Sequence, residues 1–86
     1  MIPSKTVEIT TADGMVDILA TYGTVAVAVE AYDGDVTFLT LSEINEQTGV
    51  ESNSKFLTSG LKDGKIIYGR FSDIRVATNT ALLHIK

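Results

Sequence analysis

The sequence predicts a small all-β protein, an antiparallel β-sandwich or jelly-roll-like small barrel of roughly seven or eight short strands. One observation is the alternation across positions 24–32, where Val25, Val27, Val29 and Ala31 occupy every second position, and which resumes across 36–41. Another is the spacing of turn residues, which punctuate the chain at intervals of roughly ten residues. We expect residues 1–86 to form one domain.

Size and composition limit the possible functions. The chain has 86 residues, of which 44% are hydrophobic and 21% charged, and it contains no cysteine. A domain this small has a thin stability margin, and here neither disulfides nor thiolate metal sites can reinforce it. Oligomerisation is therefore an expected source of stability, and no cofactor is predicted.

The central prediction is a β-hairpin. Val25, Val27 and Val29 fall on one side of an extended strand that ends in Asp33-Gly34, a dipeptide typical of tight two-residue hairpin turns. A second strand follows over residues 36–41. Alternation with period two places one face of each strand in the core.

The N-terminal third contains one ambiguous segment. Residues 5–10 alternate as a strand, and residues 10–14 read as a turn. Residues 15–22 fit either a short helix capped by Asp13 and ended by Gly23, or a further strand. The strand is favoured, because a helix this short is marginal unless it is packed.

Residues 42–61 are polar enough to form a long connection, in which residues 56–58 are a candidate short edge strand. Strands are expected at 65–68 and 71–76, with a bulge or bend at Gly69, and Ile74 and Val76 pointing inward. A last turn at 77–80 leads to a closing strand at 81–85.

Charge is divided along the sequence. Residues 1–51 carry nine acids against Lys5, a balance of −8, whereas residues 52–86 carry six bases against two acids, a balance of +4. The division could give complementary faces that meet between copies, or strands from both halves could interleave and mix the charges; mixing is favoured. The overall acidity argues against nucleic acid, and no stretch approaches the roughly 20 apolar residues of a membrane span.

No pattern predicts catalysis, so the chain is interpreted as not an enzyme, without catalytic or metal-binding residues. His84 is the only histidine and is expected at the surface or rim of its strand. Glu30, Asp33 and Asp35 could form a weak calcium site, although acids of a surface turn are the favoured interpretation.

Aromatic residues offer a different function. Tyr32, Phe38 and Tyr68 could stack on sugar rings in a glycan-binding module, while ordinary core and cross-strand packing is the favoured alternative.

Two stretches carry a family resemblance. Residues 23–34 (GTVAVAVEAYDG) followed by 36–41 (VTFLTL) resemble the hairpin of small β-sandwich structural proteins of tailed bacteriophage virions. Residues 64–76 (GKIIYGRFSDIRV) and 81–86 (ALLHIK) are similar to the closing segment of the same proteins. Together these stretches cover about half of the chain.

The resemblance implies a non-enzymatic virion component of the head-decoration, head-fibre or tail-associated type. It would assemble in the host cytoplasm and bind capsid or tail proteins, its own copies, or both. The expected contacts are the edge strands, the loop 43–59, and the charged residues Glu43, Glu46, Lys62, Lys65, Arg70 and Arg75. Two alternatives stay open: a glycan-binding β-sandwich module and a small phage-encoded regulator of a host protein.

Overall fold

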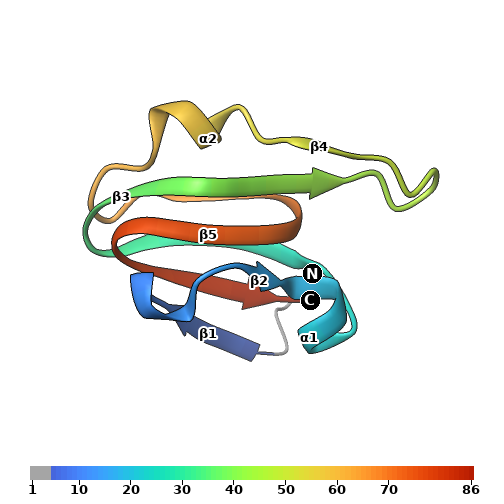
Figure 1. Ribbon diagram of the computed structural model, residues 1–86, viewed down its shortest axis with the longest axis horizontal. Coiled ribbons are helices and arrows are strands. Elements are labelled where there is room, and N and C mark those ends of the chain that lie inside the picture. Colours follow the sequence, from blue (N-terminus) through green and yellow to red (C-terminus); the bar gives the residue numbers. More distant parts are fainter. Residues whose placement is uncertain (1–4) are drawn as a thin grey trace.

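A computed structural model describes residues 5–86 as a mostly β protein with one antiparallel sheet (Figure 1). The sheet has five strands, and two short α-helices and one 3-10 turn lie between them. The strands are β1 (Lys5–Ile9), β2 (Val16–Asp17), β3 (Ala26–Ile44), β4 (Glu51–Asn53) and β5 (Ile66–Ile85). The remaining elements are η1 (Thr11–Asp13), α1 (Ile18–Tyr22) and α2 (Phe56–Ser59).

Two long strands form the centre of the fold. β3 has 19 residues and β5 has 20, and they pair over nearly their whole length. Glu30 lies opposite Leu82 near one end of this ladder and Leu41 opposite Ile74 near the other, so the residue number rises along β3 as it falls along β5. This register makes the ladder antiparallel.

The same two strands also meet a second time. The first residues of β5 pair with the other edge of β3, where Ile66 lies opposite Glu30 and Ile67 opposite Val29. The first half of β3 is therefore paired with β5 on both edges. β1 and β2 then pair with β5, and β4 pairs with the end of β3.

The prediction of seven or eight strands is wrong, because predicted turns lie inside the two long strands. At the left end of Figure 1 both β3 and β5 turn back without leaving the ladder. Gly34 in β3 has a φ of 82°, and Asn79 in β5 has a φ of 60°. One residue in the left-handed region is enough to bend each strand.

The predicted tight hairpin at Asp33-Gly34 is also wrong, although the chain does reverse there. A type I′ hairpin turn needs positive φ at both central residues, and only Gly34 has it. Within residues 5–86, the two halves of β3 pair with β5 rather than with each other.

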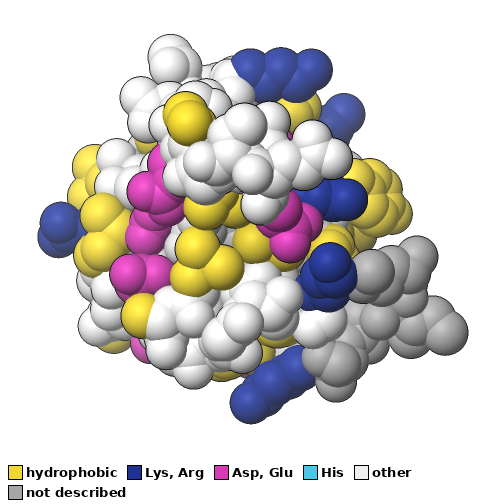
Figure 2. All heavy atoms as spheres, turned by 90° about the vertical axis from the view of Figure 1, so that its right-hand side faces the viewer, with side chains coloured by type: hydrophobic (Ala, Val, Ile, Leu, Met, Phe, Trp, Pro, Cys, Tyr) yellow, Lys and Arg dark blue, Asp and Glu magenta, His cyan; other side chains and the backbone are white. Residues whose placement is uncertain are grey.

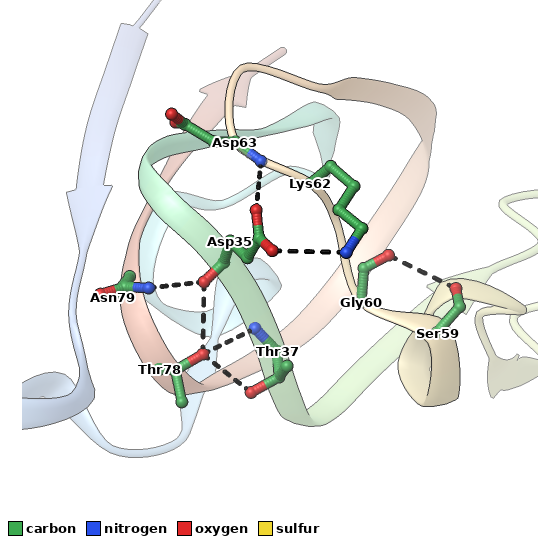
Figure 3. A network of polar contacts seen from close by, with 8 residues as sticks. All are labelled: Asp35, Thr37, Ser59, Gly60, Lys62, Asp63, Thr78 and Asn79. Atoms are coloured by element: carbon green, nitrogen blue, oxygen red, sulfur yellow. Dashed lines mark hydrogen bonds and ion pairs between the residues drawn. The ribbon is translucent and has the colours of Figure 1, made fainter.

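A polar network holds this bend (Figure 3). The Asp35 carboxylate accepts hydrogen bonds from the backbone N–H of Asp63 at 2.9 Å and from Lys62 Nζ at 3.4 Å. The Asp35 carbonyl accepts a hydrogen bond from Asn79 Nδ2 at 2.6 Å, and the Thr78 hydroxyl accepts one from the backbone N–H of Thr37 at 3.1 Å. The bends of β3 and β5 and the loop before β5 are thus fixed to one another.

Residues 15–22 form mostly a helix, contrary to the favoured prediction of a strand. β2 contributes only two residues before α1 begins. Asp17, rather than the predicted Asp13, caps the helix by accepting a hydrogen bond from the Ala20 N–H at 3.1 Å. Gly23 ends the helix in the left-handed region, and Ile18 is fully buried, so packing stabilises this short helix.

Residues 56–58 belong to α2, so the predicted short edge strand is wrong. The Ser54 hydroxyl accepts a hydrogen bond from the Phe56 N–H at 3.2 Å, which favours a turn at this point. Phe56 and Leu57 pack against the core from this helix. The turn that begins at Ser54 and the packing of Phe56 and Leu57 against the core together outweigh the β propensity of phenylalanine.

The predicted inward faces of the C-terminal strands are confirmed. Ile74 and Val76, which were predicted to point inward, are each at most 3% exposed, and together with Leu83 they join one apolar core with Val29 and Leu41 of β3. Residues from both halves of both long strands therefore share a single core.

Gly60 lies where a side chain cannot fit. Its φ is 67°, and a Cβ added there would come within 2.6 Å of the Val36 carbonyl oxygen, which accepts the Leu61 N–H. Gly60→Ala should therefore lower the free energy of unfolding by more than Gly49→Ala. Gly49 has a φ of 75° with open space around it, so its substitution costs about 1–2 kcal/mol for the backbone conformation alone.

Urea denaturation of both variants measures this difference. Equal losses of stability would show that the contact between Gly60 and Val36 is not close.

Candidate functional site

The first part of the candidate site is a polar cleft, here called the Arg70 cleft. Its volume is about 960 Å³, and it lies between the hairpin formed by β3 and β4 and the bend of β5 that carries Arg70. Its lining residues are Glu43, Ile44, Asn45, Glu46, Gln47, Thr48, Val50, Ser52 and Arg70.

Local hydrogen bonds shape the hairpin tip that borders this cleft. Asn45 Oδ1 accepts hydrogen bonds from the N–H groups of Gln47 and Thr48, at 3.0 and 3.3 Å. Asn45 also donates its own N–H to the Val50 carbonyl at 2.9 Å, which closes the turn. Val50 is 63% exposed at the end of this turn, so the tip presents an apolar side chain to solvent.

An ion-pair network crosses the cleft. Arg70 Nε lies 2.7 Å from Glu46 Oε1, and Lys86 Nζ lies 3.8 Å from Glu46 Oε2. Glu43 reaches over Gly69, where an added Cβ would lie 2.6 Å from Glu43 Oε1. Gly69, predicted as a bulge or bend, therefore makes room for a carboxylate.

The second part is a more apolar hollow of about 800 Å³, here called the Tyr68 groove. Its form follows from the strand register, which places Tyr68 and His84 on either side of Ala28. Because alanine is small, the sheet is hollow between the two larger side chains. The groove is lined by Val27, Ala28, Ile66, Tyr68, Gly69, Arg70, His84 and Lys86.

His84 is largely covered where it lines the groove. Its Nε2 lies 3.1 Å from Glu30 Oε1, and its Nδ1 lies 3.4 Å from the Thr6 hydroxyl. The His84 side chain is 19% exposed and the Glu30 side chain 33% exposed. This pair provides hydrogen-bonding groups beside the Tyr68 ring, which is 75% exposed.

The cleft and the groove are joined. Arg70 lines both, and Lys86 lines the groove while it pairs with Glu46 of the cleft. The joined site therefore combines an exposed aromatic ring, apolar side chains and a charged network. Such a surface suits an amphipathic partner.

Sequence reasoning found part of this site. Of the predicted interaction residues, Glu43, Glu46 and Arg70 meet at the Arg70 cleft. The others lie elsewhere: Lys62 is paired with Asp35, and Lys65 and Arg75 are exposed outside both hollows.

The predicted stacking residues are not brought together. Tyr68 lies in the groove, whereas Tyr32 is 58% exposed but lines neither hollow. Phe38 is 7% exposed within the core, which agrees with the favoured packing interpretation and makes its ring unavailable for the alternative, stacking on a sugar. Sequence reasoning did not assign His84, Lys86 or Val50 to an interaction surface, and for His84 it predicted only a position at the surface or rim of its strand.

Charges from the two halves of the sequence mix, as the favoured interpretation predicted. The ion pairs described in residues 5–86 each join an acid from the first half to a base from the second. Figure 2 accordingly shows acidic, basic and hydrophobic side chains interleaved over the right-hand end of the molecule.

Three carboxylates come close together on the sheet near this end. Asp73 lies opposite Asp17 of β2, and burial together with a hydrogen bond to Glu51 raises the pKa of Asp73 above its ordinary value of 3.8.

Asp35 behaves in the opposite way, because the Asp63 backbone N–H and the Lys62 ammonium lower its pKa.

Within residues 5–86, no group of three or more histidine, cysteine or acidic residues could hold a metal ion. In that same range, no helix has the length and apolar character needed to cross a membrane. Searches for a matching protein-family model, a similar curated protein and a similar solved structure each found no match.

Replacing Asp73 by asparagine should raise the melting temperature at neutral pH. Because the folded-state pKa is raised, the wild type loses stability as pH rises from 3.8 through that pKa, and asparagine mimics the protonated form. The gain should vanish below pH 3.8. Thermal melts across pH 3–8 measure it.

Asp33→Asn is the matched control, since it makes the same change in net charge at an exposed position. A gain of equal size in Asp33→Asn would show that the net charge, rather than the cluster around Asp73, is responsible.

Proposed function

We propose that the protein is a non-enzymatic structural component of a tailed-bacteriophage virion that attaches to the particle through the joined cleft and groove. The resemblance of residues 23–41 and 64–86 to small virion proteins supports the class of protein. Capsid or tail proteins and further copies of the chain are the proposed partners. The proposed location is the virion, after assembly in the host cytoplasm.

The exposure of Tyr68 is the observation that carries the proposal. A tyrosine 75% exposed beside an apolar floor is costly to leave in water, and its burial by a partner would be favourable. Tyrosine and arginine are also enriched at protein interfaces, and here Tyr68 and Arg70 lie two residues apart on the same strand.

We propose further that the sheet folds over into two layers, as in a sandwich or jelly roll. The bend at Gly34 divides β3 into two parts, and the bends at Asn79 and near Arg70 divide β5 into three. Val29 and Leu41, one from each part of β3, are both fully buried in the same core cluster. Two faces that enclose one core would explain this burial.

Tyr68→Ala should weaken attachment to the particle at least tenfold and change the free energy of unfolding by less than about 0.5 kcal/mol, because an exposed side chain contributes little to folding. Co-sedimentation with purified virions, followed by mass spectrometry, measures the retained amount.

Tyr32→Ala is the control, because Tyr32 is a comparably exposed strand tyrosine outside both hollows. Absence of the chain from purified virions would contradict the proposal. Capture of one host enzyme instead would support the regulator alternative.

Glycan binding is a second candidate, favoured by one observation. The exposed Tyr68 ring lies beside the His84 and Glu30 pair, and an aromatic face next to hydrogen-bonding groups suits a sugar ring. Saturable binding on a glycan array that is lost in Tyr68→Ala and kept in Tyr32→Ala would support this candidate over particle attachment.

A further inference from the structure

We infer that the Tyr68 groove binds the β3–β4 hairpin tip of a second copy of this chain, so that copies associate head to tail. This inference rests on the proposed use of the joined site for binding, and it names one partner for the groove. Two features of the structure support it: opposite charge on the two surfaces, and exposed apolar side chains on both.

The hairpin tip is acidic. Its charged residues are Glu43, Glu46 and Glu51, and the sequence contains no lysine or arginine from residue 6 to residue 54. The tip lies at the far right of Figure 1, beyond the rest of the sheet, where a neighbouring molecule can reach it. Exposed Val50 precedes Glu51 directly, so the tip offers an apolar side chain next to a carboxylate.

The groove has the complementary character. Its basic lining residues are Arg70, His84 and Lys86, and its other lining residues include Tyr68, Ile66 and Val27. A valine inserted beside the Tyr68 ring would bury apolar surface on both molecules. The adjacent glutamate would then lie near Arg70, whose side chain is 57% exposed despite its contact with Glu46.

The hairpin does not cover the groove of its own molecule. Glu46 reaches Arg70 and Lys86, yet Val50 stays 63% exposed and Tyr68 75% exposed. The intramolecular ion pairs therefore hold the hairpin in place at the edge of the groove, and among the described residues 5–86 both apolar side chains stay largely exposed. A second copy of the chain can cover both side chains, because its own hairpin tip and groove are exposed in the same way.

Such a contact joins two different surfaces, and this has a testable consequence. A head-to-tail contact leaves one unused tip and one unused groove in every open assembly, so copies add until a ring closes or a fibre grows. A contact between identical surfaces would instead stop at a dimer.

The test uses two variants that each disable one surface. Tyr68→Ala removes the groove ring and keeps the tip, whereas Val50→Asp removes the apolar side chain of the tip and keeps the groove. Each variant alone should be monomeric by size-exclusion chromatography with light scattering. Mixed in equal amounts, they should form a dimer that does not grow further, because only one tip and one groove remain functional.

Wild-type chain should form larger species as its concentration rises, and salt should weaken them, since charge contributes to the contact. Tyr32→Ala should assemble as the wild type does. A wild type that stays monomeric at millimolar concentration would overturn the inference, as would a mixture of the two variants that stays monomeric.

The outcome is separable from that of the proposed function. A monomeric chain that is nevertheless retained on virions, or that binds a glycan in a Tyr68-dependent way, would refute self-association and assign the groove to another partner.

Discussion

The antiparallel ladder between β3 and β5 is the constraint on which the rest of the structure depends. It runs from the pairing of Ala26 with Ile85 to that of Glu43 with Phe71, and every other strand attaches to one of these two. Because β5 also pairs with the opposite edge of β3, the first half of β3 has no free edge. A small chain without disulfides thereby pairs both edges of the first half of its central strand.

Sequence patterns predicted features that depend on neighbouring residues along the chain. They failed where the structure depends on which strands pair and which side chains are buried by distant residues. Inward residues such as Ile74 and Val76 could be predicted because alternation is a property of the strand itself. Turn residues marked the bends correctly, but whether a strand ends at Gly34 or continues through it depends on the strand beside it. For residues 15–22 the alternation favoured a strand over a helix. In the fold, the cap at Asp17 and the burial of Ile18 stabilise the short helix α1 instead.

The same ladder builds the candidate site. The sequence indicated Glu46 and Arg70 as charged contact residues for a partner, and their pairing with each other arises because strands from the two halves of the sequence interleave. The Tyr68 groove could not be predicted, because it arises from the register that places Ala28 between Tyr68 and His84. Register depends on contacts between distant residues, which a pattern of single residues does not contain.

The double pairing of β3 can be measured directly by nuclear Overhauser effects in solution. The account predicts cross-strand contacts from the backbone of Val29 to both Ile67 and Leu83, one on each edge of the strand. Contacts to only one of these two residues, or contacts between the two halves of β3 as in a simple hairpin, would contradict it.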